Sequence, residues 1–155
     1  QTAGTIVFNN VAKMIARLLP GSYSRAVWLV NNDALPQLFT MTLGNYPIYL
    51  PVGAGSGGAQ LSPYGTLMGR PIVVSQHAKS IGTAGDISFV DFGFYLIGDR
   101  QVMSAMSSPH YKFANDQTAY RIIERVDGRP WLQSAITPQN NSATLSPFVQ
   151  LATRA

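Results

Sequence analysis

Three short apolar runs stand out along the chain: Ala26–Val30, Ile72–Ser75 and Ile87–Asp91. Each run is ended by polar residues or a turn, and each has the length of a strand rather than of a helix. Adjacent valines in the second run, Val73 and Val74, are typical of a strand covered on both faces. Pro71 enters that run at a strand start, where its missing N–H is tolerated. We therefore expect these runs to form the centre of one sheet.

Two helices are predicted beside this sheet. Apolar residues repeat at i, i+3, i+4 and i+7 after Asn9 and Asn10, either of which can cap a helix that ends before Pro20–Gly21. These apolar positions are Val11, Met14, Ile15 and Leu18. A second helix is expected over Asp33–Met41, capped by Asn31, Asn32 or Asp33, with Pro36 in its first turn.

The later part of the chain favours longer strands. A Phe92–Gly93 turn leads to a further apolar run, Tyr95–Ile97, which closes on Gly98-Asp99-Arg100. Gln101–Ser107 and Thr118–Asp127 then have the pattern of an extended antiparallel pair. Ser108–Lys112 and Asn115–Asp116 are predicted to form the connection between them.

The chain is expected to return after this pair. Asp127–Gly128 is a turn signal, and Trp131–Ile136 is predicted to come back as a strand. A loop follows at Pro138–Ser142, and Phe148–Leu151 has the composition of a last strand. Asn45–Leu50 is a candidate half-hairpin ahead of a glycine-rich loop, which we expect to lie at the surface.

Neither face of the Thr118–Asp127 strand is cleanly apolar or polar. Tyr120, Ile122, Glu124 and Val126 alternate with Arg121, Ile123 and Arg125. A solvated strand with ordinary ion pairs is one interpretation. The other is a strand between its own lobe and a neighbouring subunit, where arginine–carboxylate pairs set orientation and register. Arg121, Glu124 and Arg125 are accordingly the candidate interface residues.

Composition favours an exterior that meets other proteins. Of the 155 residues 46% are hydrophobic and 12% are charged, and the charged share is about half the usual figure. A compact β-domain rich in Gly and Thr would have the same composition. The net charge of +4 comes from scattered residues, so we expect no dedicated nucleic-acid groove. The chain has no cysteine and no apolar stretch near the ~18–20 residues of a membrane span.

No group of residues predicts catalysis, a metal or a cofactor. Gly53, Gly55 and Gly58 match G-x-G-x-x-G, but no helix start follows them, so the nucleotide-binding interpretation is weak. The two histidines, His77 and His110, lack a third ligand partner. Asp86, Asp91 and Asp99 lie at turns or strand ends, where Asp commonly bonds nearby backbone. We expect no catalytic residue, no metal site, no cofactor and no small-molecule ligand.

The order and spacing of several segments carry a resemblance to a known family. They are the strand entered at Gly69-Arg70-Pro71, the Gly85-Asp86 hairpin, the aromatic run ending in Asp99-Arg100, and the strand ending in Arg125-Val126-Asp127-Gly128. Together they resemble the carboxy-terminal half of tailed-bacteriophage major capsid proteins, which have the HK97-like fold. The resemblance extends from about Thr5 to Leu151.

The resemblance implies an α+β fold with a central mixed sheet, two flanking helices and an extended strand pair. Residues 1–100, with a last strand at 145–152 returning to the sheet, would form an axial-domain-like lobe. Residues 101–136 would supply peripheral-domain-like strands. The family's amino-terminal arm, extended loop and spine helix have no counterpart here, so we expect a fragment that folds but does not close a shell. Some members form a Lys–Asn isopeptide cross-link near the position of Lys112–Asn115, and this chemistry is not carried over.

The function implied is that of a bacteriophage or prophage shell subunit that assembles into pentamers and hexamers around the genome. Packaged DNA would be a partner by proximity only, no membrane would be involved, and the protein would reside in the virion after assembly in the bacterial cytoplasm. Two alternatives stay open. One is an encapsulin-like compartment shell, and the other is a small binding or hydrolytic domain that uses the Gly53–Gly58 loop.

Overall fold

The computed structural model describes residues 4–43, 46–47, 49–50, 65–140 and 143–154. It divides the chain into two compact units. We call residues 1–93 with 133–155 the lobe and residues 94–132 the arm. The boundaries expected from sequence were residues 100 and 136. The glycine-rich loop at residues 53–58 lies outside the described residues.

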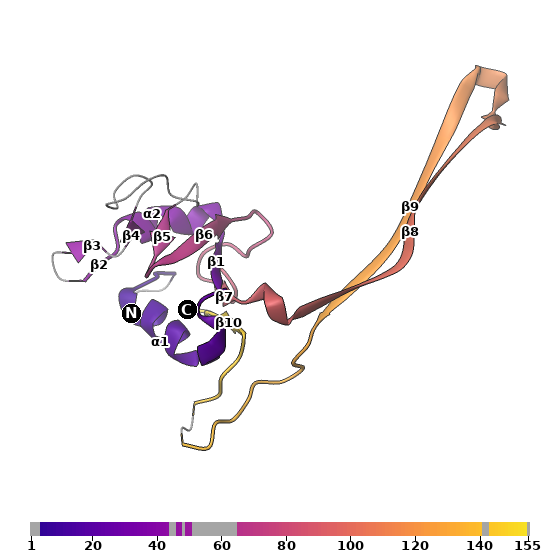
Figure 1. Ribbon diagram of the computed structural model, residues 1–155. Coiled ribbons are helices and arrows are strands. Elements are labelled where there is room, and N and C mark those ends of the chain that lie inside the picture. Colours follow the sequence, from indigo (N-terminus) through magenta and orange to yellow (C-terminus); the bar gives the residue numbers. More distant parts are fainter. Residues whose placement is uncertain (1–3, 44–45, 48, 51–64, 141–142, 155) are drawn as a thin grey trace, which may run out of the picture. The chain divides into compact units, whose positions relative to one another are not determined.

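The lobe is built on a six-stranded mixed sheet with the strand order β10-β7-β1-β6-β5-β4 (Figure 1). Its strands are β1 (Val27–Val30), β4 (Tyr49–Leu50), β5 (Thr66–Leu67), β6 (Arg70–Val74), β7 (Ile87–Val90) and β10 (Phe148–Gln150). Strand β1 runs parallel to β6 and antiparallel to β7. The prediction that the three apolar runs share one sheet is confirmed. The last strand also returns to this sheet, antiparallel to β7.

One face of this sheet carries the core. Trp28 of β1 lies opposite Ile72 of β6 and Phe89 of β7, and all three side chains are buried. The rings of Trp28 and Phe89 stack with their centroids 4.0 Å apart. The indole N–H donates to the backbone oxygen of Leu67 at 3.0 Å, so the one polar atom of the buried indole is satisfied. Both helices contribute to the same hydrophobic cluster.

The two central strands differ in how far they are covered. Strand β7 is buried at all four positions. In β6 the side chain of Ile72 is buried but that of Val73 is 44% exposed, so the prediction of a strand covered on both faces is wrong for β6. Val73 pairs with Leu29, which places it on the face opposite the core cluster.

The first helix, α1 (Phe8–Arg17), confirms the predicted amphipathic segment but begins earlier than expected. Its N-cap is Val7, which makes no side-chain cap hydrogen bond. Asn9 and Asn10 lie inside the first turn, so their predicted capping role is wrong. Phe8 packs against the core cluster, and this burial favours a helix that starts at Phe8.

The second helix follows the predicted cap. The Asn31 side chain accepts a hydrogen bond from the N–H of Asp33 at 3.3 Å, and a 3-10 turn at Asn32–Ala34 leads into α2 (Leu35–Phe39). Pro36 sits in the first turn of α2, as expected. The α-helix is shorter than the predicted Asp33–Met41 at both ends. The half-hairpin expected over Asn45–Leu50 is divided, because β3 (Tyr46–Pro47) pairs with β2 (Thr42–Leu43) while β4 pairs with β5.

The arm is a two-stranded antiparallel ribbon of β8 (Tyr95–Lys112) and β9 (Gln117–Pro130) (Figure 1). A 3-10 turn at Phe113–Asn115 joins the strands, and Asp116 closes it in the left-handed conformation. The predicted antiparallel pair is confirmed and is longer than expected. Residues 108–112, expected in the connection, belong to β8.

Two predictions for the end of this ribbon are wrong. Asp127 and Gly128 form no turn but pair with Gly98 and Ile97 inside the ladder. Residues 131–136 form no strand, and only an isolated bridge joins Ile136 to Leu145. The reason is that β8 begins at Tyr95, so β9 has partners up to Pro130 and the chain leaves the ribbon only afterwards.

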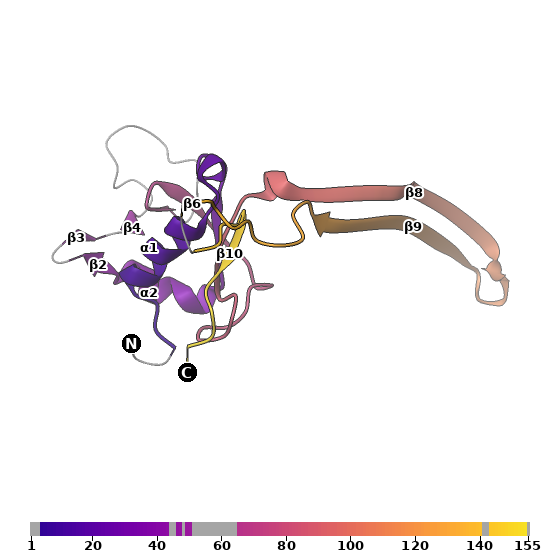
Figure 2. The same ribbon diagram turned by 90° about the horizontal axis from the view of Figure 1, so that it is seen from below.

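The extra residues of the arm all lie on one strand. β8 has 18 residues and β9 has 14, and the register shifts at three places, 99–101, 101–104 and 108–112 on β8. These shifts place one, one and two additional residues on β8. Extra residues bend the strand that carries them, and the ribbon is curved (Figure 2). Pro109 falls in the last of these shifts, where a missing N–H breaks no ladder bond.

Candidate functional site

The arm is the candidate site because its apolar surface has no core beneath it within residues 94–132. None of these residues, all of which the structure describes, is buried. Twelve of the 19 large hydrophobic side chains exposed in the described part of the chain belong to this unit. An isolated two-stranded ribbon is marginally stable in water, and exposed apolar patches mark interaction sites. The arm can therefore bury this surface on another protein surface.

The register separates the arm into two faces. Because β9 carries no extra residue, its side chains alternate without interruption, as the sequence predicts. One face, here the apolar face, has Tyr120, Ile122 and Val126 opposite Ser107, Ala105 and Asp99. The other, here the arginine face, has Arg121, Arg125 and Arg129 opposite Met106, Gln101 and Leu96.

The three candidate interface residues are exposed but do not share a face. Arg121 and Arg125 lie four positions apart on the arginine face, with Ile123 between them. Glu124 lies on the apolar face, beside Ile122 and Val126. A partner that contacts Arg121 and Arg125 together therefore approaches the side of the ribbon away from Glu124.

A hollow lies near the tip of the arm, and sequence reasoning missed it. Its volume is about 570 Å³. It is lined by Met106, Ser107, Ser108, Tyr111, Ala119, Tyr120 and Arg121. Met106, Tyr111 and Tyr120 are each more than 65% exposed, and so is Phe113 in the adjacent turn. The signal in the sequence was the cluster of aromatic residues around the predicted connection.

Each of the three carboxylates singled out from sequence, Asp86, Asp91 and Asp99, contacts a partner of its own. Asp86 is buried and pairs with Arg154, while Asp91 is buried and pairs with Arg25 at 2.8 Å. Asp99 is exposed and accepts a hydrogen bond from the N–H of Gln101 at 3.0 Å. Asp86 and Asp91 lie at opposite ends of β7 (Ile87–Val90), each against its own arginine, and not as the facing pair that a hydrolase of the two-carboxylate type would need.

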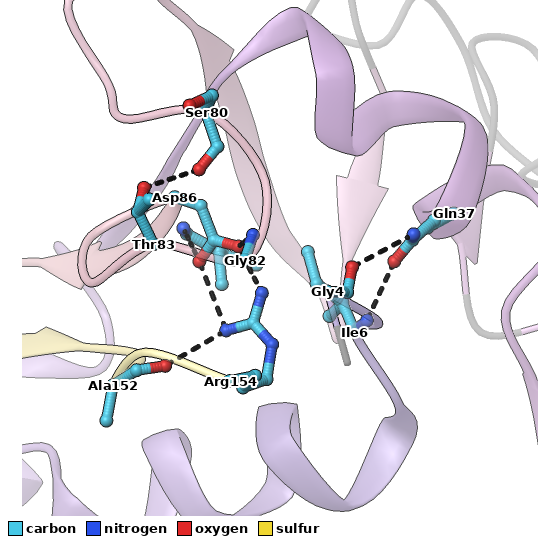
Figure 3. Close-up of polar contacts among 10 residues, drawn as sticks. Gly4, Ile6, Gln37, Ser80, Gly82, Thr83, Asp86, Ala152 and Arg154 are labelled. Carbon is cyan, nitrogen blue, oxygen red and sulfur yellow. Dashed lines mark hydrogen bonds and ion pairs between the residues drawn. The ribbon is translucent and has the colours of Figure 1, made fainter. Parts of the chain in front are cut away.

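The Asp86–Arg154 pair joins distant parts of the lobe (Figure 3). Asp86 also accepts hydrogen bonds from the backbone N–H groups of Gly82 and Ile87, at 2.9 and 2.8 Å. The backbone of Arg154 bonds to Gly82 and, at its carbonyl, to the N–H of Gly4. This pair therefore fastens the carboxy-terminal segment beside both the loop before β7 and the amino-terminal segment.

The pKa of the Asp91 carboxyl is set by two opposing effects, burial and contacts with nearby donors. Burial alone would raise the pKa of its carboxyl, but hydrogen bonds, the one from Arg25 foremost, and the charge of Arg25 together outweigh burial, and the pKa is lowered. The same contact raises the pKa of Arg25. The site is a structural anchor at the end of β7.

The described residues give two further findings, one on metal ligands and one on membrane-spanning helices. They contain no cluster of three or more His, Cys, Asp or Glu side chains that could hold a metal ion. His77 and His110 are both exposed and lie in different units. No helix in the described part of the chain has the length and apolar content needed to cross a bilayer.

Comparison with known proteins identifies the family. The model of the phage capsid family matches residues 1–140. Among solved structures, the chain is similar to a chain from the capsid of an empty GTA particle computed with C5 symmetry, with a TM-score of 0.57 and 20% identity. The alignment covers 78% of this chain and 40% of that chain, so this chain spans less than half the length of its structural neighbour. No curated protein sequence matches.

These findings agree with the fold. The mixed sheet, the two helices and the antiparallel strand pair are the elements expected for an HK97-like α+β fold, and the structural neighbour is a capsid chain. The family match covers nine-tenths of the sequence, including the whole arm and most of the lobe. The chain belongs to the phage capsid family.

Proposed function

We propose that this chain is a structural subunit of a phage-type capsid shell and that it acts by assembly rather than by catalysis. Family membership supports the shell role. The observation that carries the proposal is the arm, whose two faces are uncovered within its own unit and rich in exposed apolar and arginine side chains. In a shell, repetition by symmetry lets modest contacts of this kind add up.

In this proposal the lobe is the axial-domain-like part and the arm is the peripheral-domain-like part. Copies of the chain assemble into pentamers and hexamers, and the genome is enclosed without a dedicated nucleic-acid groove. Arg121, Glu124 and Arg125 contact neighbouring copies. Since Glu124 lies on the opposite face from both arginines, these residues serve two different contacts: Glu124 one on the apolar face, and the arginines one on the arginine face.

Expression of the complete gene that encodes this chain tests the shell proposal. We expect closed particles in negative-stain microscopy and light scattering, with nucleic acid inside that is protected from nuclease. Particles that hold a cargo protein instead of nucleic acid would favour an encapsulin-like compartment. A product that stays monomeric under all assembly conditions would contradict the shell role.

Charge reversal on the arginine face tests the interface residues. The double variant Arg121→Glu/Arg125→Glu should lower particle yield, because both side chains are exposed and contact a neighbour only in the assembled state. Its melting temperature should stay close to that of the wild type, since exposed substitutions usually change stability by no more than about 0.5 kcal/mol. The matched control is Lys13→Glu/Lys79→Glu, which makes the same charge change at exposed positions of the lobe. Equal loss of yield in the control would show that net charge, not the arginine face, matters.

A further inference from the structure

The tip of the arm carries both a projecting aromatic side chain and a hollow that this side chain does not line. Phe113 sits on the 3-10 turn between β8 and β9 and is 80% exposed. The tip hollow is the cavity of about 570 Å³ bounded by Met106, Tyr111, Ala119, Tyr120 and Arg121 with two serines, and Phe113 is absent from its walls. In a single copy the Phe113 side chain, here called the knob, is therefore exposed to solvent and does not fill the hollow of its own tip.

The hollow suits an aromatic side chain. Its volume lies in the range of pockets that hold small ligands, about 300–1,000 Å³, so one phenyl ring enters with room to adjust. The Met106 thioether makes favourable contacts with aromatic rings, and the two tyrosines offer edges and faces for ring packing. Arg121 at the rim can place its guanidinium over a phenyl face. Ala119 supplies the small wall that leaves the space open.

The tip carries exposed charges of both signs, so an anionic group of one tip can pair with a cationic group of an identical tip. Lys112 and Arg121 are cationic, Asp116 is anionic, and all three side chains are exposed. Neither ion pair found among the described residues involves them. Asp116 is held beside Phe113 by the left-handed conformation that closes the turn. Asp116 follows Phe113 by three positions, so an inserted knob can bring its carboxylate to Arg121, which lines the hollow.

We propose that Phe113 of one copy inserts into the tip hollow of a second copy of this chain. The proposal rests on the shell function and specifies a contact within it. Knob and hollow are different parts of one tip, which permits a heterologous contact: each copy gives its knob to one neighbour and receives a knob from another. Heterologous contacts close into rings when the rotation between copies allows it, and a shell built around symmetry axes needs this.

Three variants test the contact by sedimentation and by particle yield. Phe113→Ala removes the knob and keeps the hollow, while Ala119→Trp fills the hollow and keeps the knob. We expect each to weaken association by about tenfold or more, because a buried aromatic anchor is lost. Val102→Ala is the matched control: it removes an equally exposed apolar side chain of the arm outside the tip and should change association little.

A mixing experiment separates this contact from general loss of hydrophobic surface. The Phe113→Ala copy still has a hollow and the Ala119→Trp copy still has a knob, so an equimolar mixture should form heterodimers more readily than either variant self-associates. Melting temperatures of both variants should match the wild type, which excludes misfolding of the lobe. Absence of heterodimers in the mixture, or wild-type association of Phe113→Ala, overturns the proposal.

The outcome is distinguishable from failure of the shell function. Closed particles from the complete gene with unchanged yield for Phe113→Ala would leave the shell function standing and reject the knob contact. Heterodimers in the mixture without particles from the complete gene would support the tip contact and reject the shell. High salt should also weaken the association of wild-type copies, because it screens the attraction between Asp116 of one tip and Arg121 of the other.

Discussion

Asp86 and Asp91 border β7, one at each end, and each is buried beside one arginine from a distant part of the chain. Arg154 comes from the carboxy-terminal segment and Arg25 from the residues before β1. Their hydrogen bonds to nearby N–H groups fix the backbone where β7 begins and ends. Strand β7, which is buried at all four positions, is thus held in place by polar contacts as well as by packing.

Loss of Arg154 should destabilise the lobe strongly. The variant Arg154→Met keeps much of the side-chain volume but leaves the Asp86 carboxylate buried without its cation. Breaking a buried pair in this way costs about 3–5 kcal/mol. We expect a decrease of this size in the free energy of unfolding measured by urea titration. The double variant Arg154→Met/Asp86→Leu should lose less stability than the two single variants added together, because it leaves no unpaired charge. A midpoint shift no larger than that of the exposed control Lys79→Met would contradict the role of this pair.

Asp91 should make stability depend on pH on the acid side. Its native pKa is lowered, and an unfolded Asp titrates at about 3.9, so its stabilisation is present above that pH and is lost as pH falls through the native pKa. Asp91→Asn should therefore flatten the acid limb of the stability curve below about pH 4. Arg25→Gln should raise the native pKa, because burial is then opposed by fewer hydrogen bonds. If Asp91→Asn lost stability at acid pH as steeply as the wild type, the Asp91 carboxyl would not contribute to the pH dependence of stability.

At the scale of elements, the lobe was largely predictable from the sequence. β1, β6 and β7 are short apolar runs with clear ends, and α1 has a helical repeat of apolar residues, so burial and periodicity point to the same structure. The helix start was not predictable, because packing of Phe8 outweighed the capping preference of Asn9 and Asn10. Exposure of Val73 depends on what covers the second face of the sheet, which local sequence does not contain.

The arm shows why the rest could not be predicted. The alternation along β9 was correct because that strand is regular, whereas the extra residues of β8 shift its register at three places that have no local signal. Asp127–Gly128 is a common turn sequence, but here Gly128 lies under the ring of Tyr95. A Cβ atom at residue 128 would come within 2.6 Å of the Tyr95 ring. This glycine permits a close side-chain approach and makes no turn.

The candidate site was likewise predictable on the regular strand β9 and not at the tip of the arm. Arg121, Glu124 and Arg125 were placed on alternate faces of one strand by the period of two, and their exposure agrees with an interface role that remains a proposal. Phe113 and the tip hollow were missed, because residues 108–112 were expected to form a loop. Their position depends on the two additional residues that β8 accommodates before Lys112 pairs with Gln117.

At the scale of the whole molecule, the two units differ in what stabilises them. The lobe has a buried cluster of apolar side chains with contributions from both helices and the central strands. The arm has a long ladder of backbone hydrogen bonds and no buried residue. Segments with few buried apolar contacts open locally at low free-energy cost, even when the rest of a protein stays folded.

Amide hydrogen exchange should therefore divide the chain at the unit boundaries. In the unassembled chain, amides of β8 and β9 should exchange much faster than those of β1 and β7, because the arm can open without exposing a core. In assembled particles the arm should become protected, most strongly around Phe113 and the tip hollow, while protection of β1 and β7 should change little. Exchange measured by mass spectrometry on both forms checks this. If arm amides exchanged as slowly as those of β1 before assembly, the ribbon would be stable alone. Stabilisation of the arm would then no longer be a physical reason for it to bind a neighbouring copy.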